Sequence, residues 1–88
     1  MRYRQHPDAA SSVIAGEAAV VTPQDSRLHL LDPVATRVWE LCEGSGRTQE
    51  SLVHELMKEY EGEAAEIARD VESLLQELQA LSVIAVVE

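Results

Sequence analysis

The sequence predicts an α+β domain in which a three-stranded antiparallel β-meander is followed by three helices, in an arrangement like a winged helix-turn-helix. Two observations predict this fold class. The N-terminal part contains short apolar runs separated by turn residues, which is typical of a meander. The remainder has apolar residues at helical spacing, interrupted by glycines. A chain of 88 residues is long enough to bury the core of one domain.

The meander is expected to occupy the first part of the domain. Gly16-Glu17 is typical of a tight turn, and Pro, Asp and Ser at residues 23–26 are typical of a wider one. Residues 1–11 are expected to form a flexible lead-in, and residues 12–88 the domain itself. Such short strands need a covering layer to be stable. The three strands are expected at residues 12–15, 18–22 and 27–31.

The helices supply that covering layer. Asp32 suits the N-cap of the first helix, because its carboxylate can accept from free amides of the first turn. Pro33 suits the first helical position, where its missing N–H removes no bond. Thr48 suits the N-cap of the second helix, and the tail at residues 82–87 is expected to be extended. The helices are expected at residues 33–43, 49–60 and 63–81.

The charge of the chain is strongly acidic and unevenly placed. The formal net charge is −9. Residues 1–31 carry three basic and three acidic side chains, whereas residues 32–88 carry four basic and thirteen acidic ones. Such a surface repels phosphate backbones and anionic membranes and favours cationic partners. We therefore expect neither nucleic acid nor a membrane as the partner.

No residue pattern typical of catalysis, metal binding or cofactor binding is found. His6, His29 and His54 lack the spacing of zinc ligands. Cys42 lies on the apolar stripe of the first helix and is interpreted as a core thiol rather than a nucleophile. We expect a protein that is not an enzyme and has no cofactor. With one cysteine and no signal peptide, the simplest setting is the reducing cytoplasm.

An interaction module remains as the leading interpretation. The strand at residues 27–31 lies at an edge of the predicted meander, and an edge offers unpaired backbone groups to an extended peptide. A winged-helix nucleic-acid-binding protein is the second interpretation, and a regulatory or structural partner protein is the third. The edge could also pair with itself, so a monomer and a weak or strand-swapped homodimer are both compatible with the sequence.

Three short motifs follow one another along the helical part of the chain: VWEL at residues 38–41, TQESLVHEL at residues 48–56 and DVESLLQEL at residues 70–78. With these motifs, the sequence over residues 12–84 resembles the PqqD family, the precursor-recognition elements of ribosomally synthesised and modified peptides. The chain has Leu31-Asp32 where the family usually has Leu-Asn, and Ser82 where it often has Gly. It also has Leu28-His29 where the family often has Tyr.

The resemblance implies a non-catalytic adaptor. Such a protein binds the leader segment of a precursor peptide by β-strand addition and presents it to a modifying enzyme, often a radical S-adenosylmethionine (radical SAM) protein. Trp39 is assigned to the core. The peptide-binding residues that the resemblance implies are Arg27, Leu28, His29, Leu30 and Leu31 on the third strand and Val71, Leu74, Leu75 and Leu78 on the third helix.

Overall fold

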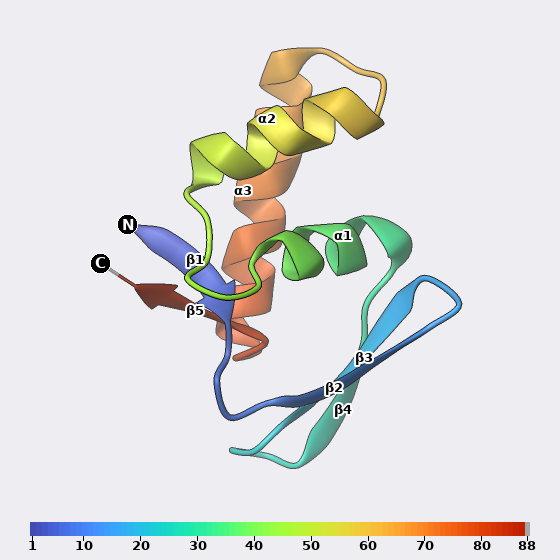
Figure 1. Cartoon of the computed structure of the whole chain (residues 1–88), viewed down its shortest axis with the longest axis vertical. Coiled ribbons are helices and arrows are strands. Elements are labelled where there is room, and N and C mark those ends of the chain that lie inside the picture. The colour runs from blue at the N-terminus through green and yellow to red at the C-terminus, as the bar shows by residue number, and fades with distance from the viewer. Residues whose placement is uncertain (88) are drawn as a thin grey trace.

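The computed structural model describes residues 1–87 and has the predicted α+β fold class (Figure 1). A three-stranded antiparallel sheet in the order β2-β3-β4 is followed by three helices. A second sheet pairs the two ends of the chain. The elements are β1 (Arg2–Gln5), β2 (Ala10–Ile14), β3 (Glu17–Thr22), β4 (Arg27–Leu30), α1 (Pro33–Leu41), α2 (Gln49–Glu59), α3 (Ala64–Ala80) and β5 (Ile84–Val87).

The expected flexible lead-in at residues 1–11 is wrong, because strand β1 lies within it and pairs antiparallel with β5. Tyr3 also exchanges two backbone hydrogen bonds with Arg47, of 2.7 and 2.8 Å. Gly46 is required beside this pairing, since a Cβ atom there would collide with the carbonyl of Tyr3. The domain therefore begins near the start of the chain, and Glu88, the last residue of the expected domain, lies outside the described residues.

The turn between β2 and β3 falls one residue earlier than predicted. Ile14 pairs with Glu17, so Ala15 and Gly16 form a two-residue loop. Their φ angles are +53° and +80°. Two positive φ values are those of a type I′ turn, whose twist matches that of the flanking strands. Ala15 is unusual at such a position, because its Cβ makes the left-handed conformation unfavourable.

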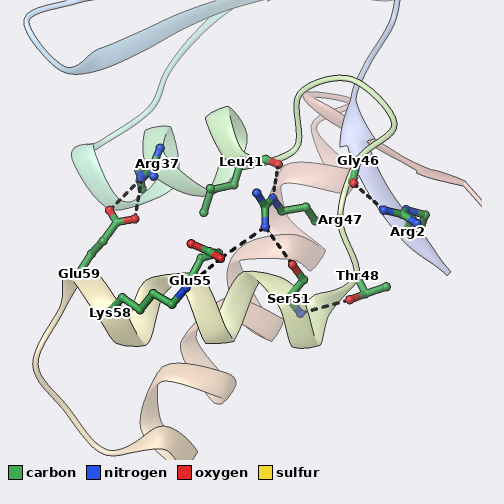
Figure 2. Close-up of polar contacts among 10 residues, drawn as sticks. All are labelled: Arg2, Arg37, Leu41, Gly46, Arg47, Thr48, Ser51, Glu55, Lys58 and Glu59. Atoms are coloured by element: carbon green, nitrogen blue, oxygen red, sulfur yellow. Dashed lines mark hydrogen bonds and ion pairs between the residues drawn. The ribbon is translucent and has the colours of Figure 1, made fainter.

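The helix ends follow the expected capping chemistry. Asp32 accepts the Ala35 N–H at 2.7 Å, and Thr48 accepts the Ser51 N–H at 3.2 Å, which confirms both predicted N-caps (Figure 2 draws the second). Helix α3 ends in a Schellman motif centred on Ser82, whose φ is +62°. A glycine at this position, which the resemblance to the PqqD family implies, would adopt the positive φ without strain.

The core lies among the three helices, one face of the three-stranded sheet and strand β5. Cys42 is fully buried, which confirms its interpretation as a core thiol, and burial raises its pKa to about 11. Five apolar residues that fall at helical spacing in the sequence are exposed at the margins of the buried helix faces: Val34, Met57, Tyr60, Ala64 and Leu81. The larger fully buried side chains include Val20, Val38, Leu52, Val71, Leu75, Leu78, Val83 and Ile84.

Polar contacts tie the helices to the sheet and to one another. The buried Thr36 hydroxyl accepts the Ala18 N–H at 2.9 Å and donates to the Leu31 carbonyl at 3.2 Å, so it bridges β3 and the end of β4. Figure 2 shows Arg37 of α1 bound to Glu59 of α2 through two hydrogen bonds of 2.8 and 3.0 Å. The start of α1 is thus fixed against the strand that leads into it.

Candidate peptide-binding site

One edge of the three-stranded sheet is formed by β4. Within residues 1–87, β4 pairs with β3 and with no other strand. The apolar tail, which could have filled this edge, pairs with β1 instead as strand β5 (Figure 1). The edge at β4 is therefore open in the described part of the chain.

The hydrogen-bond pattern shows which backbone groups this edge presents. The Leu31 N–H donates to the Ala18 carbonyl at 2.8 Å, so this residue pair is a hydrogen-bonded one. Along an antiparallel ladder, hydrogen-bonded and non-hydrogen-bonded pairs alternate. Since Leu30 lies opposite Ala19 and Leu28 opposite Val21, these are non-hydrogen-bonded pairs. The N–H and C=O groups of Leu28 and Leu30 consequently point away from β3, toward an added strand.

The side chains of β4 alternate between the two faces of the sheet. Leu28 and Leu30 are 60% and 74% exposed. On β3, Ala18 and Val20 are fully buried, so they point to the core face of the sheet. The β3 residues opposite Leu28 and Leu30 alternate with these two residues, so both leucines point to the face away from the core. His29 and Leu31 lie on the core face, where Leu31 is buried. Leu28 and Leu30 therefore project from the solvent face of the sheet, whereas His29 and Leu31 point toward the core.

His29 is held in place by the turn that precedes β4. The Thr22 hydroxyl donates to Asp25 at 2.6 Å, so the His29 Nε2, 3.2 Å from that hydroxyl oxygen, is the donor in their contact. Asp25 also accepts the Arg27 N–H at 3.1 Å. These hydrogen bonds, that of Thr22 first, lower the pKa of the Asp25 carboxyl. Arg27 itself is exposed at the beginning of the strand.

A groove runs beside this edge, between the β4–α1 junction and α3; we call it the β4–α3 groove. It consists of three adjoining hollows of about 160, 310 and 220 Å³. The first adjoins β4, the second lies at the start of α1, and the third reaches α2. Leu74 lines all three hollows, so they adjoin at this residue. The residues from β4 and the β4–α1 junction that line the first hollow are His29, Leu30, Leu31 and Asp32.

The four predicted α3 residues differ in whether they line the groove and in how far they are exposed. Leu74 is half-buried at its centre, and Val71 and Leu78 border it while being 2% exposed. Leu75 is equally buried but lines none of the three hollows, so it is a core residue. Three of the four predicted α3 residues, Val71, Leu74 and Leu78, thus line the groove, and Leu75 does not.

Several groove residues were not predicted. They follow a second stripe on α3, one position before the buried stripe, with the same helical spacing. The sequence contains this pattern, and the acidic surface was expected to favour cationic partners, but these carboxylates were not assigned to the peptide-binding site. Leu74, at the centre of this stripe, was predicted; the unpredicted α3 residues are Ile67, Asp70, Glu77 and Leu81, and those contributed by other elements include Asp32, Val34 and Tyr60.

Among residues 1–87, no group of three or more His, Cys, Asp or Glu side chains is placed to hold a metal ion. In the same part of the chain, no helix combines the length and the apolar character needed to span a membrane.

An open strand edge beside an apolar groove defines a domain that can accept an extended peptide as an additional strand. Comparison with protein families makes this assignment narrower. The chain belongs to the PqqD family, because the family model described as Coenzyme PQQ synthesis protein D (PqqD) matches residues 17–84. No curated protein sequence matches the chain.

Two solved structures have the same fold. One is described as TbiB1 in complex with the TbiA(beta) leader peptide; it has a TM-score of 0.85 and 22% identity, with 97% of this chain and 98% of that chain covered. The other is lasso peptide synthetase B1 complexed with the leader peptide, with a TM-score of 0.82, 16% identity, and 98% and 100% of the two chains covered.

Proposed function

We propose that this chain is a non-catalytic adaptor that binds the leader segment of a ribosomally made precursor peptide and presents it to a modifying enzyme. The observation that carries the proposal is the open edge of β4, where the backbone groups of Leu28 and Leu30 face outward. A leader segment bound there would hydrogen-bond these groups and place alternate side chains toward the β4–α3 groove.

The comparisons support this proposal in two ways. The chain belongs to a family named for a step of coenzyme synthesis. The two proteins of the same fold are both described as bound to leader peptides. Binding both the leader and the enzyme would raise the concentration of substrate near the enzyme, which increases the rate without any chemistry by the adaptor.

Further features of the proposal concern the setting and the partner. The modifying enzyme is proposed to be of the radical SAM class, and the location the cytoplasm. The domain would act as a monomer or as a weak, strand-swapped homodimer, because an open edge can pair with a second copy of itself. The likeness of its helices to a winged helix-turn-helix remains a prediction.

Fluorescence anisotropy tests the proposal against the nucleic-acid alternative. The probes are the labelled leader segment of a short open reading frame beside this chain's gene, and random duplex DNA at low salt. We expect saturable binding of the leader and none of the DNA, since the chain carries a net charge of −9. Binding of DNA without binding of the leader would contradict the proposal.

A further inference from the structure

The β4–α3 groove extends well past the strand edge, and this extension has a distinct chemistry. Its middle hollow, of about 310 Å³, has Val34 and Leu74 as its apolar residues. Carboxylates lie around them on both walls: Asp32 at the start of α1, and Asp70 and Glu77 on α3. Because Leu74 follows Asp70 by four residues and precedes Glu77 by three, these side chains are neighbours on one helix face.

These carboxylates have no cationic partners in the described part of the chain. None of them takes part in an ion pair there. Arg37, the basic residue of α1, is bound to Glu59, and no Lys or Arg lines any of the three hollows. Asp32 uses one carboxylate oxygen for its N-cap bond, which leaves the other available. The groove is therefore apolar at its floor and negative on both walls.

We infer that the guest peptide continues beyond β4 along this groove, and that this stretch combines apolar side chains with Lys or Arg. This inference rests on the proposed peptide binding and adds its selectivity. The apolar side chains would cover Val34 and Leu74, and a cation would lie between Asp32 on one wall and Asp70 and Glu77 on the other. Continuity of the groove with the open edge favours one peptide over two separate ligands.

A displayed library of random short peptides, selected against the immobilised full chain, tests the inference without knowledge of the natural leader. We expect the enriched peptides to contain more Lys and Arg than the input library. In the best binder, replacing the Lys or Arg by Gln is expected to weaken binding by about threefold to tenfold. The affinity should also fall as the salt concentration rises.

A double-mutant cycle locates the effect. The groove variant Asp70→Asn/Glu77→Gln should bind the best binder more weakly, by the same factor as the Lys→Gln change in the peptide produces with the unsubstituted chain. On the groove variant, the Lys→Gln change should cause no further loss of affinity. The control variant Glu66→Gln/Glu72→Gln changes the net charge equally with exposed carboxylates of α3 that line none of the three hollows. The control variant should retain most of the affinity for the best binder, and the Lys→Gln change in the peptide should weaken binding to it as much as to the unsubstituted chain.

The outcomes separate this inference from the proposed function. Binders that depend on β4, as shown by weaker binding to Leu30→Pro, but that are not enriched in Lys or Arg would overturn the inference alone. Equal losses in the groove and control variants would also overturn it, because the effect would then be one of overall charge. A library from which no peptide is enriched would overturn both.

Discussion

The two edges of the three-stranded sheet, β2 and β4, offer the same backbone chemistry in different surroundings. On β2, the ladder leaves the groups of Ser11 and Val13 pointing outward, as those of Leu28 and Leu30 do on β4. The edge at β2 is exposed along its whole length. The edge at β4 has the β4–α3 groove beside it. The two edges therefore differ in whether a groove adjoins the unpaired backbone groups, and our proposal assigns the peptide to the edge that has one.

The largest expected effect concerns the contact that fixes β4 in position. Thr36→Val removes the hydroxyl that bridges Ala18 and Leu31, which leaves a buried N–H and a buried C=O without partners. We expect the free energy of unfolding to fall by about 2–3 kcal/mol, as measured by urea denaturation. In the described chain no side-chain hydrogen bond reaches β2. The edge at β4 is therefore held by a side-chain hydrogen bond to α1, and the edge at β2 is not.

Thr36→Ser is the matched control, because it retains the hydroxyl and removes only a methyl group. It should remain clearly more stable than Thr36→Val. If both variants lost the same stability, packing of the methyl group rather than the hydrogen-bonded bridge would hold β4 to α1.

Proline substitutions compare the two edges directly. Leu30→Pro removes an outward N–H of β4 and should weaken peptide binding by about tenfold, since one hydrogen bond is lost and the ring obstructs the added strand. Ser11→Pro removes an outward N–H of β2 and should leave the affinity unchanged. Both sites are edge positions, where proline is tolerated in a sheet.

Titration of a labelled peptide against the two purified variants measures this difference, with circular dichroism to establish that both are folded. Equal affinity for Leu30→Pro and the unsubstituted chain would contradict binding at β4. A loss with Ser11→Pro instead would place the peptide on the other edge.

A smaller effect is expected at the turn that leads from β2. Ala15→Gly removes a side chain from a residue with φ +53° and should raise the free energy of unfolding by about 0.5–1 kcal/mol. Peptide affinity should not change, because Ala15 lines none of the three hollows of the β4–α3 groove. Thermal denaturation measures the gain, and a loss of stability would show that the Ala15 methyl group makes contacts that outweigh the strain.

The smallest effect is expected at the turn that leads into β4. Hydrogen bonds from Thr22 and Arg27 lower the pKa of Asp25, so its carboxylate form stabilises the folded chain. This contribution is complete above the ordinary value of 3.8 and is lost as the pH falls through the lower value in the fold. Asp25→Asn should not show the loss of stability at low pH that protonation of the Asp25 carboxylate causes in the unsubstituted chain.

Urea denaturation of the unsubstituted chain and of Asp25→Asn, at neutral pH and at a pH below 3.8, measures how the difference in free energy of unfolding changes with pH. Glu59, whose pKa is lowered by its hydrogen bond to Arg37, titrates in both chains and cancels in the difference. A difference between the two chains that does not change with pH would show that Asp25 contributes nothing through its charge.

Local chemistry made much of this fold predictable. The helix starts could be predicted from single residues: the Asp32 carboxylate and the Pro33 ring for α1, and the Thr48 hydroxyl for α2. The structure places all three residues as expected. The fold class followed from the alternation of short apolar runs and helical stripes. The strand at Arg2–Gln5 was missed because RYRQ is polar, and its pairing with β5 joins the two ends of the chain. No local pattern carries that information.

The candidate site was predictable only in part, for a related reason. The expected strand edge required no more than strand order, and the structure leaves it open in residues 1–87. The helix wall required knowing how far α3 is rotated about its axis. That rotation buries Leu75 and turns Asp70 and Glu77 toward the groove. A difference of one position along a helix is set by packing between elements, which the sequence of α3 alone does not reveal.

Amide hydrogen exchange, resolved by residue with and without a bound peptide, tests the central claim most directly. A peptide that adds as a strand should slow the exchange of the Leu28 and Leu30 amides, which have no partner within residues 1–87 in the free chain. The Ser11 and Val13 amides of the other edge should be unaffected. Unchanged exchange at Leu28 and Leu30 under saturating peptide, or protection confined to β2, would contradict the account.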